Sequence, residues 1–190
     1  MEKTIRQTES NITRIVFYGP ESTGKSTLAR KMAEYFNTDW VPEYARDLLQ
    51  VKMENTGKTC ESSDMLPIVQ GQIRTENELI KTSNQYLFCD TDPLETYVYT
   101  KIYFPDEDFG WLDKLCDEFI YDYYFLTYID TPWVPDDLRD KPNEREEIFK
   151  LFYKELKIRK KNFTILKGNL QIRTEKVLET LKNYNYETNR

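Results

Sequence analysis

Short apolar runs alternate with longer amphipathic stretches along the chain. Five of the runs are brief and rich in β-branched or aromatic residues, and they occupy residues 13–18, 40–41, 86–89, 123–129 and 163–166. A brief run without polar alternation is typical of a parallel strand that is buried on both faces. Between them, apolar residues recur at helical spacing, as Leu28, Met32 and Phe36 do. These stretches predict helices over residues 25–36, 43–53, 64–82, 93–103, 111–119, 144–160 and 170–181.

Regular alternation of strand and helix predicts the fold class. It indicates an α/β fold with a five-stranded parallel sheet and helices on both faces. In such a sheet the crossovers are right-handed and ligands bind at the carboxyl ends of the strands. Residues 13–184 are predicted to form one domain, with a flexible lead over residues 1–12 and a flexible tail over residues 185–190.

The segment between the first strand and the first helix carries the clearest chemistry. It reads GPESTGKST over residues 19–27 and fits G-x-x-x-x-G-K-[ST], the phosphate-binding P-loop or Walker A motif. Its glycines let backbone N–H groups point at a phosphate, and the following helix adds partial positive charge. Lys25 is expected to reach the β- and γ-phosphates, and the Ser26 hydroxyl to bind Mg²⁺. The predicted ATP-binding residues are Gly19, Glu21, Ser22, Thr23, Gly24, Lys25, Ser26 and Thr27.

Composition narrows the function classes. The chain has 190 residues and a formal net charge of −6, which disfavours general nucleic-acid binding. No apolar run approaches the roughly 18 residues that a membrane span needs, and residues 1–12 lack a signal peptide's apolar core. Cys60, Cys89 and Cys116 have no zinc or redox spacing, so free thiols and a cytoplasmic location are expected. The chain has no histidine, so acid–base chemistry falls to Asp, Glu, Lys or Tyr.

The ends of the other strands should converge beside the P-loop. They are followed by Glu43, Tyr44 and Arg46, by Asp90 and Asp92, and by Asp130, Trp133, Asp136, Asp137 and Arg139. Asp90 fits the acidic residue that helps hold Mg²⁺ in P-loop proteins. Glu43, Asp90 and Asp92 are each placed to orient or deprotonate an acceptor hydroxyl, and the sequence leaves that choice open. Glu43 could instead be a helix-dipole partner and Asp92 a helix N-cap.

Residues 130–142 are rich in proline and charge, and they predict a lid. Arg139 would close over the phosphates and neutralise the charge that develops on the transferred group. Arg145, on the following helix, is better explained as a solvated surface charge. Trp40 and Trp133 could stack on a flat acceptor ring or simply fill the core.

Several of these motifs together resemble one known family. GPESTGKST, WVPEYAR (residues 40–46), Gly71-Gln72 with Glu76 downstream, LFCDTD (residues 87–92) and TPWVPDDLR (residues 131–139) occur in the order and spacing of the ribosylnicotinamide kinase domain of NadR-type proteins. The resemblance covers about residues 14–182 and implies the P-loop (AAA-like) kinase fold with a lid.

The resemblance also implies a reaction and roles for particular residues. The reaction is transfer of the γ-phosphate of ATP, with Mg²⁺, to the 5′-hydroxyl of nicotinamide riboside, giving nicotinamide mononucleotide for NAD biosynthesis. Ser26 and Asp90 would bind the metal, and Lys25, Glu43, Asp90, Asp92 and Arg139 would be catalytic. Trp40, Glu43, Tyr44, Arg46, Gln72 and Trp133 would bind the nucleoside.

Two other readings of the P-loop stay open from the sequence. A regulatory ATPase that switches with nucleotide, or a kinase for a different nucleoside, would carry the same motif. The acidic strand ends favour a neutral or cationic acceptor over a monophosphate, which would need a basic cluster. NadR-type proteins usually carry an N-terminal adenylyltransferase domain, whereas the P-loop strand here starts near residue 13, so a separate adenylyltransferase partner could use the product. The partners expected are a nucleoside substrate, with no nucleic acid and no membrane, and the oligomeric state is not predicted.

Overall fold

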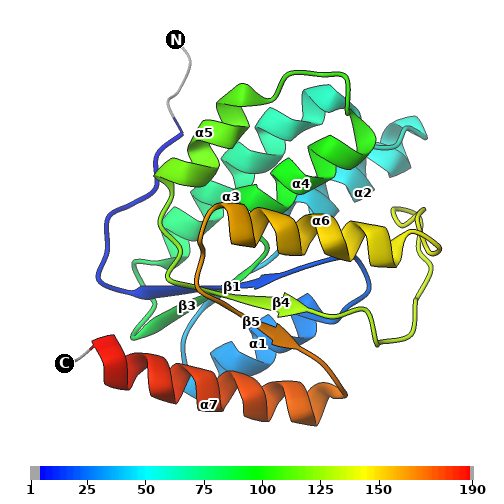
Figure 1. Cartoon of the computed structure of the whole chain (residues 1–190). Helices are drawn as coiled ribbons and strands as arrows, with labels where there is room; N and C mark the ends of the chain where they lie inside the picture. The colour runs from blue at the N-terminus through cyan, green and yellow to red at the C-terminus, as the bar shows by residue number, and fades with distance from the viewer. Residues whose placement is uncertain (1–4, 189–190) are drawn as a thin grey trace.

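A twisted parallel sheet forms the centre of the molecule, and the computed structural model describes residues 5–188 (Figure 1). Its strands lie in the order β2-β3-β1-β4-β5. They are β1 (Thr13–Tyr18), β2 (Trp40–Val41), β3 (Tyr86–Asp90), β4 (Tyr123–Thr127) and β5 (Phe163–Leu166). All the strand pairs are parallel, which confirms the predicted fold class.

Helices cover both faces of this sheet, as the sequence predicts. They are α1 (Lys25–Phe36), α2 (Tyr44–Thr56), α3 (Met65–Leu79), α4 (Pro93–Tyr103), α5 (Gly110–Glu118), α6 (Arg145–Ile158) and α7 (Leu170–Thr188), with a short 3-10 helix η1 (Ser62–Asp64) before α3. In Figure 1, α1 and α7 lie on one side of the sheet, and α3, α4, α5 and α6 lie on the other.

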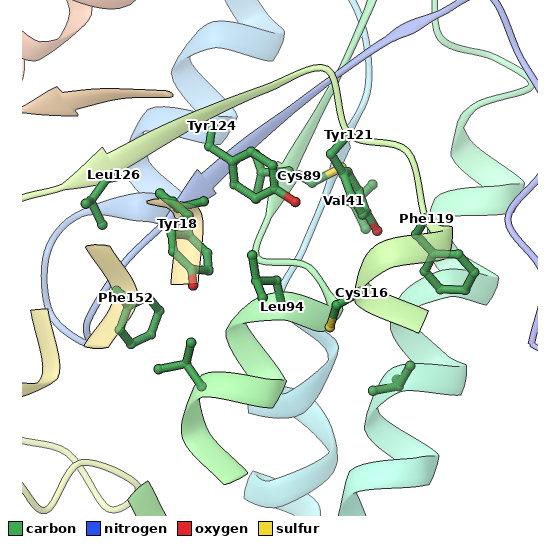
Figure 2. Close-up of a cluster of buried hydrophobic side chains, with 14 of the residues drawn as sticks. Tyr18, Val41, Cys89, Leu94, Cys116, Phe119, Tyr121, Tyr124, Leu126 and Phe152 are labelled. Carbon is green, nitrogen blue, oxygen red and sulfur yellow. The ribbon is translucent and has the colours of Figure 1, made fainter. Parts of the chain in front are cut away.

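The side chains of β1 alternate between two hydrophobic clusters. Ile15 and Phe17 pack with Leu28 and Met32 of α1 and with Val177 of α7. Val16 and Tyr18 join the larger cluster on the opposite face, which includes side chains from α3 to α6. Figure 2 shows Tyr18 beside Phe152 of α6 in this cluster. Because both faces are covered, β1 is apolar without interruption from Ile15 to Tyr18, and this explains why that part of its sequence lacks polar alternation.

The structure differs from the sequence prediction at both ends of the chain. The predicted flexible lead makes defined contacts over residues 5–12: Gln7 Nε2 donates to Glu76 Oε1 at 2.8 Å, and Ile5 and Ile12 pack against the larger cluster. Helix α7 continues to Thr188, beyond the predicted boundary at residue 181. Residues 1–4 and 189–190, which also fall in the predicted lead and tail, lie outside the described part of the chain.

Contacts of the lead centre on a buried ion pair. Arg14 Nε lies 2.8 Å from Glu76 Oε1, and both side chains are almost completely buried. Tyr121 donates to the second Glu76 oxygen at 2.8 Å, and Arg14 also donates to the Thr8 carbonyl. A buried charge pair is tolerable only with its remaining hydrogen bonds satisfied, and Gln7, Thr8 and Tyr121 supply partners here.

The carboxyl ends of β1, β3 and β4 share one edge of the sheet, because the strands are parallel and in register. The P-loop, the Asp90–Asp92 segment and the lid all begin at this edge. Among the described residues, no helix is long and apolar enough to cross a membrane.

Candidate active site

The P-loop leaves β1 at Gly19 and enters α1 at Lys25. Gly19 and Gly24 both have positive φ, at 140° and 85°. A Cβ on Gly19 would lie 2.7 Å from Thr127 Oγ1, so β4 leaves no room for a side chain there. Glycine is therefore required at position 19 by both backbone conformation and packing.

Neighbouring elements hold this loop in place. The Thr23 hydroxyl donates to the Pro20 carbonyl at 2.7 Å and lies 2.6 Å from the Thr127 hydroxyl. The buried Arg173 of α7 donates to the Thr23 carbonyl at 2.6 Å and to the Tyr128 carbonyl at 2.8 Å, and it also pairs with Asp130. The loop is thus shaped by contacts from β4 and α7, which the Walker A pattern alone does not reveal.

The Lys25 ammonium lies inside the loop. It donates to the carbonyls of Gly19 at 2.7 Å and Pro20 at 3.1 Å, and it lies 3.1 Å from Glu95 Oε1. Burial lowers the pKa of Lys25, but the surrounding carboxylates Glu95, Glu43 and Asp90 outweigh burial and raise it. Lys25 is therefore a protonated ammonium positioned for a phosphate.

Asp90, at the end of β3, suits a cation held with the help of phosphates. Burial raises the pKa of this carboxyl to about 6, Glu43 adds to the rise, and Lys25 and a side-chain hydrogen bond with Ser26 oppose it. One carboxylate oxygen, Oδ1, is buried without a hydrogen-bond partner among the described residues. Within residues 5–188, no group of three or more His, Cys, Asp or Glu side chains is arranged to hold an ion alone. Ser26 and Asp90 thus fit a Mg²⁺ ion only when phosphate oxygens and water complete its shell.

Two cavities meet at this edge of the sheet. The first, which we call the phosphate cleft, has a volume of about 460 Å³ and lies between the P-loop, α2 and the lid. The second, the acceptor cavity, has a volume of about 190 Å³ and lies between α2, α3, α4 and the lid. Their shared wall contains Glu21, Glu43, Leu49, Glu95, Tyr99 and Leu138.

The acceptor cavity is acidic and partly aromatic. Its carboxylates are Glu21, Glu43, Glu95, Asp137 and Asp140, and its apolar walls include Leu49, Met65, Ile68, Tyr99, Tyr103 and Phe104. No lysine or arginine of the described chain lines it. Burial raises the pKa of Glu21 to about 7, despite the opposing charge of Lys25.

Two polar atoms of the acceptor cavity have unused hydrogen-bonding capacity. The Gln72 amide accepts from the Tyr44 backbone N–H at 2.8 Å through Oε1, which leaves its Nε2 buried and without a partner in the described structure. The Tyr99 hydroxyl is likewise buried and unpartnered within residues 5–188. Buried polar atoms normally find partners, so these two mark where a bound molecule would form hydrogen bonds.

The structure brings several sequence-predicted residues to these cavities. Glu43 lines both, Gln72 lines the acceptor cavity, and Arg46 and Arg139 line the phosphate cleft. The two arginines both contact Asp136 of the lid, at 2.6 Å from Arg46 Nη2 and 3.1 Å from Arg139 Nε.

Other predicted residues lie away from both linings. Trp40 packs against the cluster beneath α1, and the Arg30 guanidinium lies 5.4 Å from its ring centre, so it contributes to the core. The Tyr44 side chain covers Gly71 of α3. The guanidinium carbon of Arg145 lies over the Trp133 ring, 5.6 Å from the ring centre.

Asp92 is held by the protein's own groups. Its Oδ1 accepts from the Glu95 backbone N–H at 3.0 Å, and its Oδ2 accepts from the Tyr124 hydroxyl at 2.7 Å. This is the N-cap arrangement of α4 that the sequence leaves open as an alternative. Burial raises the pKa of Asp92 to about 6. Both carboxylate oxygens are therefore already engaged in structural contacts.

Glu95 was not predicted as a site residue from the sequence, and Arg145 does not lie where a solvated surface charge would. Glu95, in the first turn of α4, lines both cavities, pairs with Lys25 and accepts from the Gly19 N–H at 3.3 Å. The sequence does hold a clue to Glu95: it lies three residues after Asp92, so one turn of helix places its side chain on the same face, at the edge of the sheet. Arg145 is half-buried and donates to the carbonyls of Thr131 and Ser22, so it joins the lid to the P-loop instead of facing solvent alone.

Comparisons with solved structures define the class. The chain has the fold of P-loop nucleoside and nucleotide kinases, with TM-scores of 0.65 to a thymidylate kinase from Ehrlichia chaffeensis and 0.68 to a deoxyadenosine kinase from M. mycoides. Those proteins are 19% and 12% identical, and the match covers 91% and 90% of this chain and all of each of theirs.

The chain belongs to the family described as AAA domain, which it matches over residues 14–173. It is similar to the trifunctional NAD biosynthesis/regulator protein NadR of Salmonella typhimurium and of Escherichia coli, at 34% identity over 125 residues in each case. A NadR protein solved in complex with NR has a TM-score of 0.77 and 25% identity, covering 92% of this chain and 52% of that one. These relatives confirm the resemblance to the NadR-type kinase domain and agree with an ATP-dependent kinase. The chain spans only 30% of the length of the curated relatives that it matches.

Proposed function

We propose that the protein is an ATP-dependent nucleoside kinase that phosphorylates the 5′-hydroxyl of nicotinamide riboside. The observation that carries the proposal is the acidic acceptor cavity, which has no basic residue in its described lining and opens onto the P-loop. A phosphorylated acceptor would place its negative charge in an acidic cavity whose lining offers no lysine or arginine to compensate it. A cationic pyridinium nucleoside gains from the same carboxylates and from the aromatic walls.

Gln72 and Tyr99 support a nucleoside acceptor. Gln72 Oε1 accepts from the Tyr44 N–H, so the orientation of the amide is fixed and the atom left for a ligand is the donor Nε2. A carboxamide oxygen, such as that of nicotinamide, is a suitable acceptor for it. Tyr99, on the wall shared by the two cavities, can bond a ribose hydroxyl near the phosphates.

Phosphoryl transfer requires an in-line arrangement across that shared wall. The acceptor's 5′-oxygen attacks the γ-phosphorus, the bond to the β–γ bridging oxygen breaks, and ADP leaves. Glu43 and Glu95 each line both cavities, so these carboxylates can orient the acceptor hydroxyl and take its proton. Lys25 and Arg139 stabilise the negative charge of the phosphates. Ser26 and Asp90 would hold Mg²⁺, which neutralises charge on the phosphates when bound.

A coupled assay of ADP production across a panel of acceptors tests this proposal. The panel contains nicotinamide riboside, adenosine, cytidine and thymidine monophosphate, with the product identified by mass. Nicotinamide riboside should give the highest kcat/KM, and Lys25→Ala should abolish turnover. Selective phosphorylation of another acceptor would refute the assigned substrate. ATP hydrolysis that no acceptor stimulates would indicate the regulatory ATPase instead.

A further inference from the structure

Lys25 already has a protein partner for each of its three N–H donors. Two are the carbonyl oxygens of Gly19 and Pro20, and the third is Glu95 Oε1. A lysine ammonium has only three donors, so a phosphate oxygen must replace at least one of these partners. Nucleotide binding is therefore an exchange of partners at Lys25.

Glu95 is the partner that a phosphate displaces. The two carbonyls belong to the P-loop backbone, whose shape is fixed by Thr127 and Arg173. Glu95 is instead a side chain, and its carboxylate carries the same charge as the incoming phosphate. Its other oxygen accepts from the Gly19 N–H at 3.3 Å, a long contact that is easily exchanged.

Once displaced, Glu95 needs a new hydrogen-bond donor. The side chain is 4% exposed, so water provides little compensation. Burial raises the pKa of Glu95 well above its ordinary value, and the charges of Glu43 and Asp90 add to the rise, which the charge and hydrogen bond of Lys25 offset only in part. Because Glu95 also lines the acceptor cavity, an acceptor hydroxyl can supply the missing donor.

We propose that Glu95 couples the binding of the two substrates. The phosphates displace Glu95 from Lys25, and the Glu95 carboxyl group then accepts a hydrogen bond from the hydroxyl that is to be phosphorylated. The inference rests on the proposed function for the identity of that acceptor. Coupling of this kind is reciprocal, so each substrate strengthens the binding of the other.

Calorimetric titration of wild type, Glu95→Gln and Glu43→Gln tests the coupling. The probes are Mg²⁺ with the non-hydrolysable analogue AMP-PNP, and nicotinamide riboside with and without saturating AMP-PNP. In the wild type, AMP-PNP should lower the Kd for nicotinamide riboside about 10-fold. In Glu95→Gln that factor should fall below about 2, and AMP-PNP alone should bind about 5-fold more tightly, since no ion pair must break.

Glu43→Gln is the matched control. Glu43 lines the same two cavities and influences Lys25 through its charge, so this variant removes an equal charge from the same wall. It should weaken nicotinamide riboside binding equally with and without AMP-PNP, and thereby keep the coupling factor. The inference is overturned if Glu95→Gln keeps the wild-type factor, or binds AMP-PNP no more tightly than Glu43→Gln. If nicotinamide riboside binds no variant, the proposed acceptor is wrong, while the AMP-PNP comparison still decides whether Glu95 competes for Lys25.

Discussion

Asp90 and Asp92 stand two residues apart, yet their surroundings differ. Asp90 lies beside Ser26 and Lys25 and has an unpartnered oxygen in the described structure, whereas Asp92 is fully engaged by Tyr124 and the start of α4. We expect Asp90→Asn to lower kcat/KM by about 10²-fold or more, because it removes the charged carboxylate that would help to hold Mg²⁺ at the phosphates. Asp92→Asn keeps an N-cap side chain and should stay within about 3-fold of wild type. The coupled assay measures both, and equal losses would contradict the assigned roles.

The pH dependence should follow the Asp90 carboxyl. Its pKa is raised to about 6, so it is ionised above that pH and becomes neutral as the pH falls through it. An ionised carboxylate is required to help hold Mg²⁺, so kcat/KM should drop on the acid side with a midpoint near pH 6. Asp92→Asn should leave this acid limb in place. A wild-type profile that is flat from pH 5 to pH 8 would contradict the prediction.

Between elements, the approach of α2 to α3 positions one side of the acceptor cavity. The Tyr44 ring lies so close to Gly71 that a Cβ at position 71 would be 2.0 Å from a ring carbon. Gly71→Ala should therefore displace α2, destabilise the fold by about 1–3 kcal/mol and raise the KM for the acceptor. Urea unfolding and steady-state kinetics measure the two effects. The double variant Gly71→Ala with Tyr44→Ala should lose less stability than the two single changes added together, and strict additivity would exclude this contact as the cause.

The lid is joined to α2 through Asp136, which contacts both Arg46 and Arg139. Arg139 also donates to the Val134 carbonyl at 2.6 Å, so its guanidinium is held at the phosphate cleft. We expect Arg139→Ala to lower kcat by about 10²–10³-fold while the Kd for AMP-PNP changes much less, because its charge acts on the transferred phosphate. Arg139→Lys should recover only part of the loss, since lysine lacks the fork geometry. A kcat close to wild type in Arg139→Ala would remove this residue from the mechanism.

At the scale of the whole molecule, the lead and the active site lie at opposite edges of the sheet. Deleting residues 2–9 removes Gln7 and Thr8 from the buried Arg14–Glu76 pair. We expect a loss of about 1–3 kcal/mol in the free energy of unfolding, because a buried charge loses hydrogen-bond partners. The kcat should stay within about 2-fold, since the hydrogen bonds of Gln7 and Thr8 lie at the opposite edge of the sheet from the P-loop. Thermal unfolding and kinetics on the same preparation provide the check.

Much of this architecture could be predicted from the sequence, because buried parallel strands leave continuous apolar runs. The bounds of β1, α1, β2, α4 and β5 agree with the prediction residue for residue. Helix α2 shows the limit: it has no buried residue, since its inner face lines the two cavities instead of the core. Val51, an apolar residue of this helix, is 56% exposed. A cavity wall and a core face carry similar apolar spacing, so periodicity cannot separate them.

For the site, the Walker A pattern predicted the P-loop, and the strand ends predicted that Glu43 and Arg139 would lie beside it, because the carboxyl ends of parallel strands share one edge of the sheet. Local sequence could not show that Asp92 turns toward Tyr124, or that Glu95 returns to the P-loop, because each depends on a residue far along the chain. The role of Trp40 was likewise decided by Arg30 and the core beneath α1. Contacts between distant segments carry that information.

Arg173 gives the C-terminal helix a direct contact with the nucleotide site. Through its bond to the Thr23 carbonyl, α7 is held at its start by the same loop that receives the phosphates. Nucleotide that stabilises the P-loop should then slow the opening of a helix it never touches. We expect AMP-PNP to protect α7 from limited proteolysis, and Arg173→Ala to lose that protection while its digestion without nucleotide becomes faster.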